Sequence, residues 1–266
     1  MKLAWLTDIH LNFLRPPSLE AFLGVLAGTE ADTFVISGDT GESHDLSRYL
    51  TAIGEAVRRP VYFVLGNHDF YQGSIASVRG QVRVLCASAT NLRWLPDAGV
   101  VPLAGEACLV GHDGWGDGRL GDYHGSGVLL NDFGLIEEFG GFEADPLERL
   151  ARLNALGDEA AAHFRRVLPD ALARFRHVVV ATHVPPVREA CWHQGRISDD
   201  DWLPFFSCKA VGDVLAGAMA AAPDRRMTVL CGHTHGGGEA LVLPNLRVLT
   251  GEARYGTPVV QRVLEV

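Results

Sequence analysis

No apolar run in this sequence approaches the roughly 20 residues that a membrane-spanning helix needs. The opening stretch, MKLAWLTDIH, holds one Lys, and its apolar run ends at Asp8, too early for the core of a secretory signal peptide. Internal repeats and low-complexity linkers are also missing from the sequence. These absences argue against a membrane protein, and we expect a soluble protein of the cytoplasm.

An excess of basic charge is missing too. The chain has 23 Lys and Arg against 32 Asp and Glu, which gives a formal net charge of -9. Its arginines are scattered in short pairs such as Arg58-Arg59 and Arg165-Arg166. Proteins that grip long nucleic acids usually carry a basic stripe or patch, so this charge distribution speaks against such a partner.

Cysteine is scarce, with five residues and no CxxC pair. An odd count without paired spacing argues against a disulfide framework and fits a reducing compartment. The 266 residues, 47% of them apolar, are enough to bury a large core without such cross-links. We therefore expect one domain over residues 1–266.

Short apolar runs recur along the chain and are separated by polar loops and helical patterns. The runs expected to be strands are 2–6, 33–36, 61–65, 178–181 and 228–231. Helical spacing of apolar residues predicts helices over 46–57, 146–175 with a break at Pro169, and 210–221. Strand, loop and helix in alternation are typical of an α/β protein with parallel strands.

Each of these five runs stops at Asp, Asn or His. The clusters are Asp8-x-His10, Gly38-Asp39, Gly66-Asn67-His68-Asp69, His183, and Gly232-His233-Thr234-His235. Ligands of open α/β sheets bind beyond the carboxyl ends of the strands. Clusters far apart in the sequence are therefore expected to converge in space.

Taken singly, these motifs have ordinary explanations. Asp8 or Asp39 could be a turn residue or a helix cap, and His183 could be a hydrogen-bonded core histidine. All five in this order, from residue 8 to residue 235, resemble the calcineurin-like metallophosphoesterases. The resemblance implies an α/β fold with four layers, in which a two-sheet β-sandwich is flanked by α-helices.

The resemblance also implies a centre of two divalent or mixed-valence metal ions. It assigns the first ion to Asp8, His10 and His235, the second to Asn67, His183 and His233, and the bridging position to Asp39. Imidazole, carboxylate and amide oxygen together suit Mn, Fe or Zn. Two carboxylates do not neutralise two such cations, so the site favours an anionic substrate.

Further residues are candidates for contact with the substrate. The resemblance places His68 beside the phosphate as a general acid or hydrogen-bond donor, together with the ligand Asn67. Asp69 follows His68 and is expected to orient its ring. His112 ends another strand and Arg119 suits a phosphate oxygen, although a solvated surface role is an ordinary alternative for both. The irregular segments 112–141 and 184–207 are expected to lie over the cleft.

The function expected from the resemblance is hydrolysis of a small phosphodiester or phosphomonoester by a metal-activated hydroxide. A nuclease acting on short oligonucleotides is the alternative within the same chemistry. A non-catalytic binding scaffold of the same fold is the alternative from another class. Lost ligands or a lost His68 would be the mark of a scaffold, and the sequence keeps them all.

Overall fold

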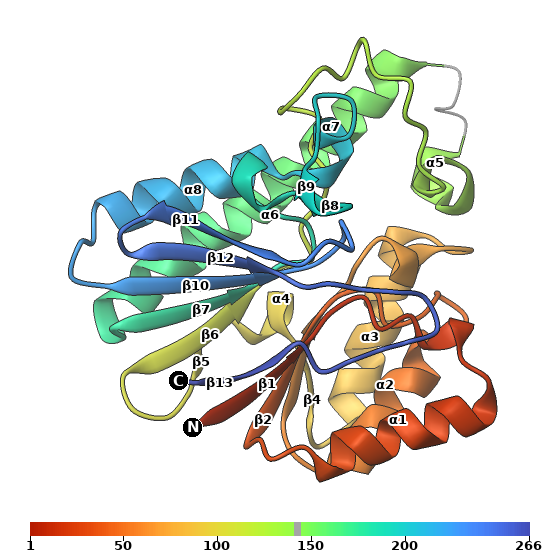
Figure 1. Cartoon of the computed structure of the whole chain (residues 1–266), viewed down its shortest axis with the longest axis vertical. Helices are drawn as coiled ribbons and strands as arrows, with labels where there is room; N and C mark the ends of the chain where they lie inside the picture. Colours follow the sequence, from red (N-terminus) through yellow and green to blue (C-terminus); the bar gives the residue numbers. More distant parts are fainter. Residues whose placement is uncertain (141–144) are drawn as a thin grey trace.

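Two β-sheets form the centre of the protein, which a computed structural model describes over residues 1–140 and 145–266 (Figure 1). The first sheet has the strand order β13-β1-β2-β3-β4. Its strands are β1 (Lys2–Leu6), β2 (Thr33–Ser37), β3 (Val61–Val64), β4 (Leu92–Trp94) and β13 (Arg262–Glu265). The first four run parallel, and β13 pairs antiparallel with β1.

The second sheet has six strands in the order β11-β12-β10-β7-β6-β5. They are β5 (Val101–Pro102), β6 (Ala107–Gly111), β7 (His177–Ala181), β10 (Arg226–Cys231), β11 (Gly238–Leu243) and β12 (Leu246–Thr250). The four central strands are parallel, and the two edge strands are antiparallel to their neighbours. The five runs expected to be strands are all strands here, with ends that differ by at most two residues.

Helices cover the outer face of each sheet (Figure 1). The first sheet packs against α1 (Pro16–Gly28), α2 (Leu46–Val57) and α3 (Ile75–Ser88), and the second against α6 (Pro146–Arg174) and α8 (Lys209–Ala220).

Alternation along the strands explains why there are four layers. In β2, Phe34 and Ile36 pack in the same core cluster as α1 and α2, while Val35 joins the cluster between the two sheets. In β7, Val178 packs with α6 and α8, and Val179 faces the other sheet. Strands buried on both faces read as continuous apolar runs. This arrangement confirms the predicted four-layer α/β sandwich.

The predicted break at Pro169 was wrong, because α6 continues through this residue. Pro169 lies on the exposed side of the helix. The carbonyl that loses its N–H partner there can bond to water instead, which makes the proline tolerable.

The segments before α6 and α8 stand beyond the carboxyl ends of the strands (Figure 1). They contain α5 (Asp132–Leu135), η3 (Glu137–Phe139), η4 (Arg188–Ala190), the strand pair β8 (Trp192–His193) and β9 (Arg196–Ile197), and α7 (Leu203–Phe206). Trp115, Tyr123 and Phe133 are buried within the first of them, which is therefore packed rather than loose. The expected end of that segment, Gly141, lies outside the described residues.

A long connection joins the two sheets near the end of the chain. Because β12 belongs to the second sheet and β13 to the first, residues 251–261 must cross between them. Figure 1 shows this dark blue connection running out past the carboxyl ends of the first sheet before it returns as β13. Within the described ranges, no helix is both long and apolar enough to cross a membrane.

Candidate metal centre and active site

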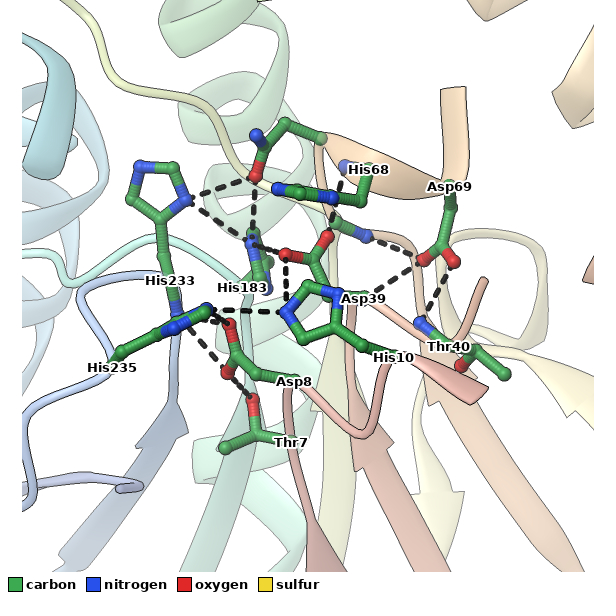
Figure 2. A network of polar contacts seen from close by, with 12 residues as sticks. Thr7, Asp8, His10, Asp39, Thr40, His68, Asp69, His183, His233 and His235 are labelled. Carbon is green, nitrogen blue, oxygen red and sulfur yellow. Dashed lines mark hydrogen bonds and ion pairs between the residues drawn. The ribbon is translucent and has the colours of Figure 1, made fainter. Parts of the chain in front are cut away.

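The turns after five strands meet where the two sheets come together, and they bring the predicted ligands into one cluster (Figure 2). Asp8 and His10 follow β1, Asp39 follows β2, Asn67 follows β3, His183 follows β7, and His233 and His235 follow β10. The ligands therefore come from both sheets.

One half of the cluster contains Asp8, His10, Asp39 and His235. One ligand atom from each of these four lies within 4.8 Å of the others. His10 Nε2 and His235 Nε2 are 3.1 Å apart, and His235 Nε2 is 3.4 Å from Asp8 Oδ1. Donors bonded to one metal at about 2.1 Å in an octahedral shell lie about 3 Å from one another. The residues of this half therefore fit a single cation.

The other half has the same spacing. Asn67 Oδ1 lies 3.1 Å from His183 Nε2 and 3.0 Å from His233 Nδ1, and these two nitrogens are 3.2 Å apart. Asp39 Oδ2 lies 3.4 Å from His183 Nε2 and 3.7 Å from His10 Nε2. A single carboxylate oxygen thus reaches both halves.

The backbone of the ligand turns adopts an uncommon conformation. In the described part of the chain, eight non-glycine residues have a positive φ, and five of them are Asp8, His10, Asp39, His233 and His235. This left-handed region costs an ordinary residue on the order of 1–2 kcal/mol. Such conformations persist where the surrounding structure fixes them, and they concentrate at functional sites.

Glycines beside the ligands leave room for the cluster. At Gly38, where φ is +98°, an added Cβ would overlap the ring of His183. At Gly232 it would overlap the carboxylate of Asp8. The chain approaches its own ligands so closely at these turns that a side chain does not fit.

Burial and neighbouring charges set the protonation of the histidines. Burial lowers the pKa of His10 to about 4, and burial together with the charge of His183 lowers that of His233 to about 3. Both rings are thus neutral and offer a lone pair to a metal. Burial also opposes the charge of His183, but Asp39 outweighs it and raises the pKa of His183 to about 10. The carboxylate of Asp39 therefore favours positive charge in its surroundings.

Asp69 has a different role from the predicted one. Its carboxylate accepts hydrogen bonds from four backbone N–H groups, those of Asp39 (3.0 Å), Thr40 (2.8 Å), Gly41 (2.9 Å) and Gly66 (2.9 Å). Burial and the charge of Asp39 raise the pKa of Asp69 to about 7, while these N–H groups oppose the shift. Asp69 ties the turns after β2 and β3 together, and these bonds do not include the ring of His68.

His68 begins η2 (His68–Phe70) directly after the ligand Asn67. Its backbone N–H donates to Asp39 Oδ1 at 2.9 Å, and its ring lies beside Asp39 in Figure 2. The ring stacks on Tyr71, with centroids 4.2 Å apart, and meets His10 edge-on at 4.6 Å. Its Nδ1 has no hydrogen-bond partner among the described residues. The ring is thus held by packing, and this Nδ1 is buried.

His112 and Arg119 lie apart from the cluster. His112 is buried with its Nε2 3.9 Å from a carboxylate oxygen of Glu159, and Arg119 donates to Asp117 and Asp158. Arg119 bonds Asp158 of α6, and the ring of His112 packs against His163 and Phe164 of the same helix, so both residues hold the segment after β6 to α6. These contacts give the predicted substrate-binding role of His112 and Arg119 no support.

Asp132 in α5 is a part of the site that no sequence pattern marked. Its side chain is 3% exposed. Asp132 Oδ1 accepts hydrogen bonds from Asn67 Nδ2 at 2.8 Å and from the Tyr71 hydroxyl at 2.7 Å. Because a carboxylate takes the amide N–H₂ of Asn67, the amide oxygen must turn toward His183 and His233. Asp132 thereby fixes the orientation in which Asn67 can bind a metal.

Replacing Asp132 by Ala is expected to weaken the second metal site about 10- to 100-fold, as loss of a partner that orients a ligand typically does. Calorimetric titration of metal-free protein with Mn²⁺ measures this. Asp132→Asn keeps an acceptor oxygen and should recover part of the affinity. Asp122→Ala in the same segment is the matched control, because among residues 1–140 and 145–266 that carboxylate accepts a hydrogen bond only from the N–H of Gly125 in its own turn. Unchanged affinity at both sites in Asp132→Ala would contradict the assigned role.

Comparison with known proteins agrees with this geometry. A family model described as calcineurin-like phosphoesterase matches residues 1–237. The fold is similar to that of a phosphopantetheinyl hydrolase from Mycobacterium tuberculosis, with TM-score 0.64 and 16% identity over 96% of this chain and 89% of that one. A dimetal phosphatase from Danio rerio has a TM-score of 0.60 and 14% identity, over 97% of this chain and 89% of that one. A 5′-nucleotidase from Candida albicans has a TM-score of 0.51 and 11% identity, over 96% of this chain and 45% of that one. At these identities the solved structures show a common fold.

Proposed function

The chain belongs to the calcineurin-like phosphoesterases, and from this premise we propose that it hydrolyses a small phosphomonoester or phosphodiester at a centre of two metal ions. The position of Asp39 carries the proposal. Its Oδ2 lies 3.4 Å from a nitrogen of one donor set and 3.7 Å from a nitrogen of the other. A carboxylate between the two donor sets is a natural way to hold two metals close together.

In this proposal Asp8, His10 and His235 would hold the first ion, Asn67, His183 and His233 would hold the second, and Asp39 would contribute its carboxylate to both. The mixture of imidazole, carboxylate and amide oxygen suits Mn, Fe or Zn. When bound, the two ions would supply the positive charge that holds a phosphate and lowers the pKa of an attacking water.

The residues of the chain complete the site around that charge. His68 would stand beside the phosphate and deliver a proton to the leaving oxygen, because it follows the ligand Asn67 directly and its ring is held next to the cluster by Tyr71 and His10. Asp69 and Asp132 would keep the ligand turns and the Asn67 amide in place through the hydrogen bonds described above.

We further propose that the chain acts as one domain. Ligands come from turns of both sheets, and an apolar cluster that includes Trp5, Val64, Val179 and Leu230 joins the sheets face to face. Neither sheet holds a complete set of ligands, so the site exists only when the two are packed together.

A substrate screen tests the proposed function. Mn-loaded protein is assayed with phosphomonoesters, cyclic nucleotides, dinucleotides and head-group diesters of phospholipids. We expect turnover of at least one class, loss of that turnover in chelator-stripped protein, and recovery to different extents with Mn, Fe, Co or Zn. Full activity without metal would overturn the two-metal proposal. Two bound metals without turnover of any class would favour a binding scaffold instead.

A further inference from the structure

The connection between β12 and β13 places an aromatic ring against the candidate metal centre. The ring centroid of Tyr255 lies 4.6 Å from that of His10, 5.0 Å from that of His235 and 6.1 Å from that of His68. Tyr255 thus contacts the half of the site assigned to the first metal and stands close to the proposed proton donor. It lies beyond residue 237, where the family match ends.

A second aromatic residue extends this surface. Phe13 ends η1 (Leu11–Phe13), the short helix that follows His10. Its ring lies 4.6 Å from that of Tyr255 with an interplanar angle of 43°, and 6.0 Å from the ring of His10. Residues from opposite ends of the chain therefore form one continuous aromatic surface beside the metal ligands.

Both rings remain open to solvent. Phe13 and Tyr255 are each 50% exposed, whereas every other Phe, Tyr or Trp of the described residues is buried or partly buried. Single exposed apolar residues are ordinary on protein surfaces. Two exposed rings that touch each other and a candidate catalytic centre are different, because they present an apolar face directly beside the candidate metal ligands.

We propose that Phe13 and Tyr255 form a stacking surface for a flat aromatic group, a nucleobase or an aryl ring, on the organic part of the substrate. The inference rests on the proposed function. With the phosphate held between the two donor sets, the ester group next to His68 comes within reach of Tyr255. Aromatic rings stack on one another through their faces with little dependence on substituents, so the surface selects flat groups as a class.

The stacking surface predicts a selective loss. Tyr255→Leu and Phe13→Leu keep apolar volume but remove the ring. Loss of one stacked ring is expected to lower kcat/KM for adenosine monophosphate and phenyl phosphate about 5- to 100-fold, mainly through a higher KM. Hydrolysis of glycerol phosphate, which has no ring to stack, should fall much less. Tyr255→Phe keeps the ring and should restore the preference for aromatic esters.

The experiment measures kcat and KM of Mn-loaded wild-type protein and these variants on the three esters, each as the monoester or methyl diester, whichever the wild type turns over. Metal content is measured in parallel. Calorimetric binding of adenosine monophosphate and of inorganic phosphate adds a readout apart from turnover. The variants should lose affinity for the nucleotide and keep it for phosphate. Leu241→Ala, which removes an exposed apolar side chain of β11, is the control.

The outcomes separate this inference from the function on which it rests. A wild-type protein that turns over none of the esters, here or in the wider screen, would count against the proposed function. If the wild type is active and Tyr255→Leu loses activity equally on aromatic esters and glycerol phosphate, or loses metal, the rings only support the ligands and the stacking proposal is wrong. A loss for adenosine monophosphate but not for phenyl phosphate would identify the flat group as a nucleobase.

Discussion

Asp39→Ala is expected to lose both metal ions and to lower kcat/KM by at least about 10³-fold, because metal binding contributes several kcal/mol to transition-state stabilisation. The reason is geometric. In the described structure Asp39 Oδ2 is the oxygen that approaches His183 of one donor set and His10 of the other. Burial opposes its charge, but nearby His183 and His68 hold the pKa of Asp39 well below its usual range, so it is a carboxylate at neutral pH. Elemental analysis and steady-state kinetics measure both effects.

Single-site variants show whether Asp39 is shared. His10→Ala should weaken mainly the first metal and His183→Ala mainly the second, so each should leave close to one ion per chain. Asp39→Asn removes the charge but keeps an oxygen that can accept the hydrogen bond from the N–H of His68. It therefore separates the effect of the lost charge from the effect of the lost hydrogen bond. Asp97→Ala is the control, because it removes an exposed carboxylate paired with Arg83 far from the ligands in sequence. Two ions per chain in Asp39→Ala would refute the bridging role.

The fold and the place of the site could be predicted from the sequence for a physical reason. Strands buried on both faces read as mostly apolar runs, so a polar cluster marks the strand end, as Thr7-Asp8 does after β1. Parallel strands end at the same edge, so such residues converge. The α/β class with parallel strands and the place of the site follow from these two facts, whereas the four-layer sandwich and the ligand set were implied by the family resemblance. All seven predicted ligands lie together in the structure. Their individual metal assignments remain predictions.

Which residues are neighbours along the chain does not decide where a side chain points. Asp69 is the neighbour of His68, yet its carboxylate turns to backbone N–H groups of the turns after β2 and β3. His112 ends a strand as the ligands do, but α6 supplies Glu159 nearby. Partners of this kind come from distant elements, so a pattern within a few residues could not reveal them.

The unforeseen parts of the site come from segments without periodicity. Asp132 is 65 residues from Asn67 along the chain, in a Gly- and Asp-rich stretch where no helical or strand spacing is visible. Tyr255 reaches His10 only because β12 and β13 lie in different sheets, which forces the connection across the strand ends. Both contacts depend on tertiary topology, and composition carries no sign of them.

His68→Ala is the second change with a large expected effect, and it should act on rate without removing metal. The bond of His68 to the ligand Asp39 is made by its backbone N–H, which alanine keeps. Its ring contacts His10 and Tyr71 through packing alone. Elemental analysis should therefore find two ions per chain in the variant. His44→Ala is the matched control, because His44 follows the turn of Asp39 and is exposed.

The dependence of the loss on the leaving group identifies what the ring of His68 does. An alkoxide needs a proton as its bond to phosphorus breaks, and a positioned acid typically contributes about 10²- to 10⁴-fold to such a step. The p-nitrophenolate ion is stable without a proton, so a general acid matters far less for its ester. His68→Ala should therefore lose about 10²- to 10⁴-fold in kcat on an alkyl ester and clearly less on a p-nitrophenyl ester. Equal losses on both esters would assign His68 to charge stabilisation of the phosphoryl oxygens instead. Unchanged rates on both would remove it from the mechanism, because neither role could then be acting in the rate-limiting step.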